Sequence, residues 1–168
     1  MLTTLVRALT YASLFVGFVL VFLPARVLEW SGIARPAIGA PQIIGGAILV
    51  LGGSLALWCV VTFALAGRGT PAPFDPPRRL VTSGPYAHVR NPMYLGAALA
   101  LAGAALFYGS VALLGYMLVF LIAAHVFVVN YEEPTLRRAF GDEYRAYCRR
   151  VRRWWPRLAG GDDNGTER

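Results

Sequence analysis

Lysine is absent from this sequence of 168 residues, and acidic residues are few: 16 arginines stand against nine Asp and Glu, a net charge of +7. A basic excess of this size would suit nucleic acid. Here, however, the arginines cluster beside long uncharged segments. Basic residues in that position are typical of proteins that contact anionic lipid headgroups. The charge therefore indicates a lipid bilayer, and no nucleic acid, as the partner.

Cysteine is scarce, and the familiar motifs of soluble enzymes are missing. Cys59 lies in an apolar run and Cys148 in a basic segment, which argues against a disulfide or metal framework. The sequence has no HExxH and no Ser-His-Asp arrangement, and Gly67-Arg68-Gly69 lacks the strand and helix that flank a phosphate-binding loop. We expect no metal site.

Charge is also missing from two long stretches, residues 43–66 and 93–130, and in the second stretch His125 and tyrosines are the only ionisable side chains. Apolar residues make up 57% of the chain, and the mean hydropathy is +0.53. A membrane-spanning helix needs about 20 apolar residues. These runs therefore predict an integral membrane protein.

A third apolar run, 5–23, could be either a signal peptide or a membrane helix. Pro24-Ala25-Arg26 is a poor cleavage site, which favours a retained helix.

The expected fold class is all-α: an integral membrane bundle of about four transmembrane helices with an amphipathic C-terminal helix. We expect helices over 5–24 and 42–66, and then a tight helical hairpin over 93–130 that breaks at 108–110. Small residues recur at four-residue spacing, which favours close helix packing but also fits a general abundance of Ala and Gly. These residues are Gly52 and Ala56, and Gly96, Ala100 and Ala104.

The C-terminal segment 132–156 is predicted to be a helix, with an apolar stripe at three- and four-residue steps and arginines over the remaining surface. The stripe consists of Leu136, Phe140, Tyr144, Tyr147 and Val151. Trp154 and Trp155 are expected at the depth of the lipid headgroups, where tryptophan is enriched. Arginine-rich segments at 67–92 and after 130 place both termini in the cytoplasm. We divide the chain into N-terminal transmembrane helices (1–66), a core (67–158) and a disordered tail (159–168).

Polar residues concentrate in the stretch "GPYAHVRNPMYLG", residues 84–96, just before the hairpin. A hairpin returns the chain to the side it left, so Arg90 is expected near Glu132 and Glu133. Charges near the membrane are costly unless they are paired or used. Either a structural salt bridge or a functional site would satisfy that condition. His88 shares the stretch with Arg90, whereas His125 is expected to be a polar residue that faces the bundle.

These motifs carry a resemblance. "LVTSGPYAHVRNPMYLG", the apolar hairpin, "EE" and "FGDEYRAYCRRVRRWWP" resemble the isoprenylcysteine carboxyl methyltransferase family and the related membrane phospholipid methyltransferases, over residues 78–157. The resemblance implies methyl transfer from S-adenosylmethionine to a lipophilic acceptor, with S-adenosylhomocysteine as product. It also implies a bacterial-type enzyme of the inner membrane, of EC class 2.1.1. The oligomeric state is left open.

The resemblance also implies which residues form the site. Those expected to bind the cofactor are Leu80, Val81, Tyr86, His88, Arg90, Asn91, Pro92, Met93, Tyr94, Gly96 and Glu132. Arg90, Glu133 and His88 are the candidate catalytic residues. Carboxylate and guanidinium groups suit the cofactor's ammonium and carboxylate, and Tyr rings suit its adenine or sulfonium. A carboxylate acceptor needs no strong base, while an amine or thiol would pass its proton to Glu133 or His88.

Two positions depart from the family's pattern. Asn91 stands where the family commonly has His, and Asn does not titrate near neutral pH. Val128 stands where eukaryotic members have a substrate-binding Arg, which weakens the case for prenylcysteine as acceptor. Two alternatives stay open: an NADPH-dependent sterol-type membrane reductase, and a small lipid-binding membrane protein without enzymatic activity.

Overall fold

The computed structural model describes residues 17–34, 36–67 and 79–156, and this part of the chain contains helices and no β-strand. The expectation of an all-helical fold is confirmed for these residues. The elements are the π-helical η1 (Gly17–Phe22), α2 (Leu23–Trp30), α3 (Ala40–Ala66), the 3₁₀-helix η2 (Gly84–Ala87), α4 (Pro92–Tyr108), α5 (Val111–Phe127), the π-helical η3 (Val128–Glu132) and α6 (Glu133–Arg150).

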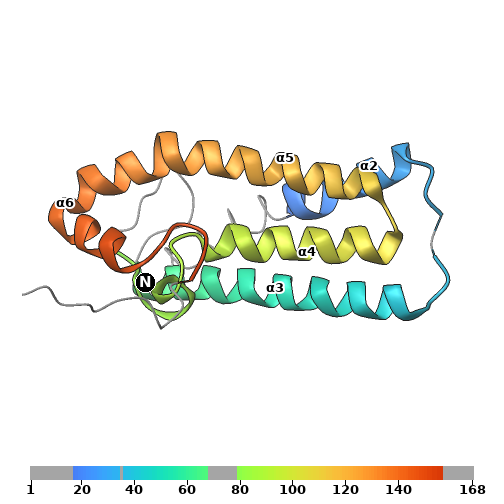
Figure 1. Cartoon of the computed structure of the whole chain (residues 1–168), viewed down its shortest axis with the longest axis horizontal. Coiled ribbons are helices and arrows are strands. Elements are labelled where there is room, and N and C mark those ends of the chain that lie inside the picture. Colours follow the sequence, from blue (N-terminus) through green and yellow to red (C-terminus); the bar gives the residue numbers. More distant parts are fainter. Residues whose placement is uncertain (1–16, 35, 68–78, 157–168) are drawn as a thin grey trace, which may run out of the picture.

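Three long helices lie side by side, with α4 between α3 and α5, and α2 contacts α5 at the end away from α6 (Figure 1). Helices α3 and α4 run antiparallel along a seam of small residues. A Cβ atom added to Gly52 would lie 2.3 Å from the backbone nitrogen of Ala100 and 2.6 Å from the carbonyl oxygen of Gly96. Only glycine allows the two backbones to approach this closely.

The predicted small-residue packing is confirmed at Gly52, Ala56, Gly96 and Ala100. The seam continues at Gly103, whose added Cβ would meet the backbone of Leu49 and Gly45. Ala104, the next residue, is partly buried, and its place in the seam stays a prediction. A helix has 3.6 residues per turn, so one face repeats in alternating steps of four and three rather than in fours alone.

The hairpin turn falls where the sequence predicts it. Helix α4 ends at Tyr108, and Gly109 follows with φ of +59°, a left-handed conformation that favours glycine. Ser110 then caps α5, because its side chain accepts a hydrogen bond from the backbone N–H of Leu113. Both helices of the hairpin have 17 residues.

Two helices are long and apolar enough to cross a membrane, judged by length and composition: α3 and the continuous helix Val111–Arg150. The apolar part of the second is α5, and its carboxylates begin at Glu132, beyond that part. Helix α4 is apolar but shorter. The count of four spans depends partly on residues 1–16, which lie outside the described residues, as do 68–78 and 157–168. It stays a prediction, as does the division into domains.

The first helix does not end at Pro24. Helical structure continues from Gly17 to Trp30, with Pro24 in the first turn of α2. Proline donates no backbone hydrogen bond to the preceding turn, and the Val19 carbonyl of that turn accepts one from the Tyr116 hydroxyl at 2.7 Å. The use of Pro24 as a boundary was therefore wrong, while the expected start of α3 is confirmed to within two residues.

The C-terminal segment is not one helix to residue 156. Helix α6 bends at Gly141 (φ +48°, ψ −118°) and ends at Arg150, and the non-helical residues 151–156 follow. We call residues 151–154 the strap. The apolar stripe is confirmed as a buried face, but it packs inward against Leu80 and is not free to lie on lipid. Trp155 is 76% exposed, whereas Trp154 contacts Tyr94 and His125.

Candidate functional site

A cavity lies where the end of α3, the loop before α4, η3 and both halves of α6 meet, and its space, counted with the open solvent at its mouth, is about 430 Å³. The residues that line it are Phe63, Leu80, Val81, Tyr86, Arg90, Asn91, Val128, Glu132, Glu133, Leu136, Tyr144 and Tyr147. The walls thus combine apolar and aromatic side chains with one guanidinium, one amide and two carboxylates.

The structure brings about half of the expected cofactor residues to this cavity. Leu80, Val81, Tyr86, Arg90, Asn91 and Glu132 line it. Pro92 is buried at the start of α4, Met93 packs on the cluster around Cys59, and Gly96 lies against α3. His88 is exposed and is not among the lining residues, so the loop carries its side chain away from the site.

Glu132 and Tyr94 form one polar pair of the site. The Tyr94 hydroxyl donates a hydrogen bond to Glu132 Oε2 at 3.3 Å. Burial raises the pKa of Glu132 to about 7; the hydrogen bond from Tyr94 opposes this shift, and the neighbouring charge of Glu133 adds to it. Tyr94 thus reaches the site through Glu132, and Glu132 is a carboxyl group that titrates near neutral pH.

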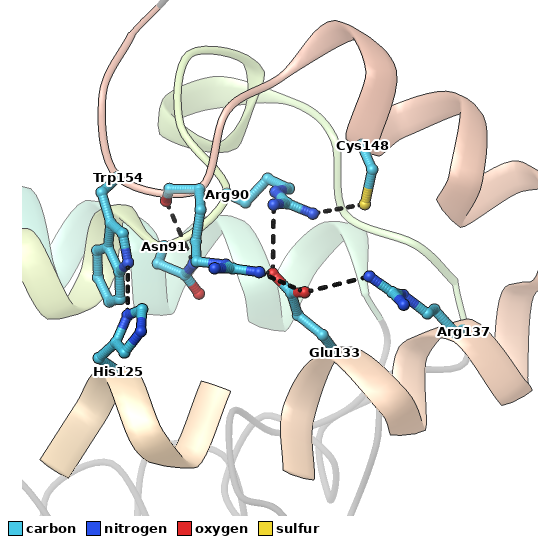
Figure 2. A network of polar contacts seen from close by, with 8 residues as sticks. Arg90, Asn91, His125, Glu133, Arg137, Cys148 and Trp154 are labelled. Carbon is cyan, nitrogen blue, oxygen red and sulfur yellow. Dashed lines mark hydrogen bonds and ion pairs between the residues drawn. The ribbon is translucent and has the colours of Figure 1, made fainter. Parts of the chain in front are cut away.

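Glu133 is the centre of an arginine network (Figure 2). Arg153 donates from Nε to Oε1 at 2.7 Å and from Nη2 to Oε2 at 2.9 Å, while Arg90 lies 3.3 Å from Oε1 and Arg137 3.5 Å from Oε2. Burial alone would raise the pKa of Glu133, but the Arg153 hydrogen bonds and the charges of Arg90, Arg153 and Arg137 together lower it. Glu133 is therefore held ionised.

Arg90 joins this network to the cavity. Its side chain is 12% exposed, and its Nη1 donates to Cys148 Sγ while Nη2 faces Glu133. Its Nε, however, is buried and has no hydrogen-bond partner among the described residues. A buried donor without an acceptor is costly, and such a group in a cavity wall is a reason to look for a ligand. The expected meeting of Arg90 with the two glutamates is confirmed, and the ion pair is with Glu133.

The strap is hydrogen-bonded to the end of the loop before α4. The backbone N–H of Arg90 donates to the Arg152 carbonyl at 2.9 Å, and Asn91 Nδ2 donates to the Arg153 carbonyl at 3.2 Å. Asn91, 5% exposed, thus has a docking role that needs a donor and no titration.

The end of the strap reaches α5. Trp154 donates from its indole N–H to His125 Nδ1 at 3.1 Å (Figure 2). The Trp154 ring also meets the Tyr94 ring edge-on. His125 is exposed and contacts the strap, which differs from the bundle-facing position expected for it. No cluster of three possible metal ligands occurs in the described part of the chain.

Several lining residues were not predicted as site residues. Tyr144, Tyr147 and Leu136 belong to the apolar stripe of α6, whose periodicity indicates burial but not which partner it faces. Phe63 lies near the end of α3, where nothing in the local sequence marks it. Tyr147 donates to the carbonyl of Tyr86 at 2.7 Å, which locks α6 onto η2. Only the bend at Gly141 brings this face over the loop.

Comparison with known proteins agrees with this arrangement. Phospholipid methyltransferase is the family whose profile matches the chain, over residues 40–143. The chain belongs to the phospholipid methyltransferase family. It is also 43% identical, over 63 residues, to an uncharacterized protein of Haemophilus influenzae (strain ATCC 51907 / DSM 11121 / KW20 / Rd); the match covers 37% of this chain and 98% of that protein. No solved structure matches the chain.

Membership in this family makes the chain a membrane methyltransferase and confirms the resemblance seen in the motifs. The matched region contains α3, α4, α5 and most of the cavity residues, but it ends at residue 143, before Tyr144, Tyr147 and the strap. The family match also favours methyl transfer over the reductase and over a lipid-binding protein without activity.

Proposed function

We propose that the cavity binds S-adenosylmethionine and that the protein transfers its methyl group to a lipophilic acceptor that enters from the bilayer. The observation that carries this proposal is that Arg90, whose buried Nε has no hydrogen-bond partner among the described residues, lines the same cavity as Glu132. A guanidinium donor and a carboxylate acceptor in one cavity match a ligand that has both a carboxylate and an ammonium group.

The aromatic walls support the same ligand. Tyr86 and Phe63 lie with ring centroids 6.2 Å apart, and Tyr144 and Tyr147 lie 6.2 Å apart on the facing helix. Rings arranged in this way offer faces and edges to a purine and to a sulfonium. When bound, S-adenosylmethionine supplies an activated methyl group for in-line displacement. The chain's own contribution is to hold the two reactants in line and to exclude water.

Proton handling in the cavity falls to Glu132. His88 is exposed away from the cavity, and three arginines hold Glu133 ionised. Glu132, with a pKa near 7, is the carboxyl group suited to exchange a proton if the acceptor is an amine or a thiol. We therefore propose Glu132 as the base in that case, and Arg90 with Glu132 as the residues that touch the cofactor. Glu133 forms ion pairs with Arg90, Arg137 and Arg153.

The same charges suggest how the protein sits in the membrane. The cavity end carries the arginines of α6 and the strap, so we propose that this end, with both termini, faces the cytoplasm of a bacterial inner membrane and contacts anionic headgroups. Labelling of Arg150→Cys in a Cys148→Ala background tests the orientation. The thiol should react in inverted vesicles and not in intact cells; reaction from outside would reverse the proposed topology.

Calorimetric binding of S-adenosylhomocysteine to the detergent-purified protein tests the cofactor. We expect saturable binding that Glu132→Gln weakens at least tenfold, that the exposed Glu143→Gln leaves unchanged, and that NADPH does not reproduce. Binding of NADPH alone would support the reductase. A folded protein that binds neither compound, even with lipid added, would exclude both enzymatic functions.

A further inference from the structure

The arginine network contains a competition that bears on cofactor binding. Arg153 Nε and Arg90 Nη2 both approach the same oxygen of Glu133, Oε1, at 2.7 Å and 3.3 Å. Arg137 approaches the other oxygen, Oε2, at 3.5 Å. Glu133 is 5% exposed, so water contributes little to satisfying its oxygens. The two closest contacts, both from Arg153, use the planar fork that suits a carboxylate best.

We propose that Arg153 is a positioning residue that saturates Glu133 and thereby leaves Arg90 free to bind the cofactor's carboxylate. This inference rests on the proposed function of the cavity. With Arg153 in place, Arg90 makes one longer contact to Glu133 through Nη2 and keeps Nε unpartnered. Without Arg153, Oε1 loses its shortest hydrogen bond, and Arg90 is the nearest guanidinium able to replace it.

The replacement would turn Arg90 from the cavity toward Glu133. A bidentate pair between Arg90 and Glu133 would use the same edge of the guanidinium that a ligand carboxylate needs, because Nε and one Nη form such a pair together. The strap would stay docked, since the backbone contacts of Arg90 with Arg152 and of Asn91 with the Arg153 carbonyl do not involve the Arg153 side chain. The effect would therefore be local to the cavity.

Arg153 lies beyond the region matched by the family, which ends at residue 143. Its side chain is 31% exposed, compared with 61% for Arg137. Both arginines contact Oε2 of the same carboxylate, but of the two only Arg153 also contacts Oε1. Arg137 is thus a matched control: its removal takes one positive charge from the network and leaves Oε1 occupied.

The test is calorimetric binding of S-adenosylhomocysteine to the full chain in detergent, with thermal unfolding to verify that each variant is folded. We expect Arg153→Gln to weaken binding at least tenfold, Arg153→Lys to weaken it less, and Arg137→Gln to change it less than twofold. The decisive variant is Glu133→Gln, which removes the competing carboxylate charge. It should bind at least as tightly as the wild type, although it breaks the same ion pair.

A purely structural role for the pair predicts that Arg153→Gln and Glu133→Gln lose affinity together, and that result would overturn the inference. Equal losses in Arg153→Gln and Arg137→Gln would also overturn it, because they would point to net charge alone. If Glu133→Gln does not fold, the order of the three arginine variants decides. Wild-type protein that binds no S-adenosylhomocysteine would overturn the proposed function and this inference together, whereas binding by the wild type with no effect of Arg153→Gln would overturn the inference alone.

Discussion

Tyr94 on α4 donates a hydrogen bond to Glu132 at the end of η3, across 38 residues of sequence. This contact joins the two helices of the hairpin at the cavity. It also stabilises the ionised form of a carboxyl group whose pKa burial raises to about 7. Glu132 therefore changes charge in the physiological pH range, and this has consequences for both ligand binding and stability.

The affinity for S-adenosylhomocysteine should rise between pH 6 and pH 8 as Glu132 ionises, because the carboxylate is the form that accepts hydrogen bonds from the ligand. The variant Glu132→Gln should show a weaker and flat profile. Calorimetry at several pH values measures both. A wild-type profile that is equally flat would show that Glu132 does not contact the ligand.

Stability should depend on pH in the opposite sense. The pKa of Glu132 is higher in the folded than in the unfolded protein, so its contribution to stability is complete below about pH 4.5 and is lost as the pH rises through about 7. The loss corresponds to about 3 kcal/mol at most. Thermal unfolding measures this effect. Between pH 5 and pH 8 the unfolding temperature of the wild type should fall relative to that of Glu132→Gln.

Gly52 and Gly53 are neighbours with opposite surroundings, so they make a matched pair. A Cβ at Gly52 would collide with the backbone of α4 at 2.3 Å, whereas a Cβ at Gly53 would meet nothing within 4 Å. Gly52→Ala should destabilise the protein by about 1–3 kcal/mol, because α3 and α4 must separate. Gly53→Ala should be neutral or slightly stabilising. Equal unfolding temperatures for the two variants would contradict the α3–α4 seam.

Gly141 determines the direction of the second half of α6. Its φ of +48° and ψ of −118° are strained for any residue with a side chain, although a Cβ there would meet no atom within 4 Å. Gly141→Ala should therefore cost about 1–3 kcal/mol through backbone conformation alone. It should also weaken S-adenosylhomocysteine binding, because Tyr144 and Tyr147 would be displaced. Gly115→Ala, in open space on α5, is the control and should leave both properties unchanged.

Asn91 tests whether the position needs a donor or a titrating group. Its amide donates to the carbonyl of Arg153, which can only accept. Asn91→Asp should destabilise the protein by about 1–3 kcal/mol, because a buried carboxylate would face a carbonyl oxygen. Asn91→His keeps an N–H donor and should be better tolerated. Asn130→Asp, at an exposed Asn with a similar bond to a carbonyl, should have a smaller effect; if Asn91→Asp were as mild, the docking role would be wrong.

Local sequence signals located most of the described helices. The uncharged run predicted α3, and Tyr108-Gly109-Ser110 predicted the hairpin turn, because glycine and a capping serine mark helix ends by their own conformational preferences. Because a hairpin returns the chain to the side it left, this turn also predicted that Arg90 lies near Glu132 and Glu133. Local signals misled at two places where contacts with other segments matter. Pro24 stands inside a longer helix and does not end it. The aromatic, arginine-rich segment after α6 is not helical, and it is hydrogen-bonded to the loop before α4.

The sequence by itself determined the membrane character, the helical hairpin, the buried stripe of α6 and the family, since these depend on composition, periodicity and short motifs. The tertiary structure decided which partners meet. In the folded protein the arginines pair with Glu133 rather than with Glu132. His88 lies outside the cavity, whereas Tyr144 and Tyr147 line it. Periodicity fixes the face on which a side chain lies. Which residues that side chain contacts depends on the bend at Gly141 and on the strap near the C-terminus. Both bring together residues that lie far apart in the sequence, so local patterns do not predict these contacts.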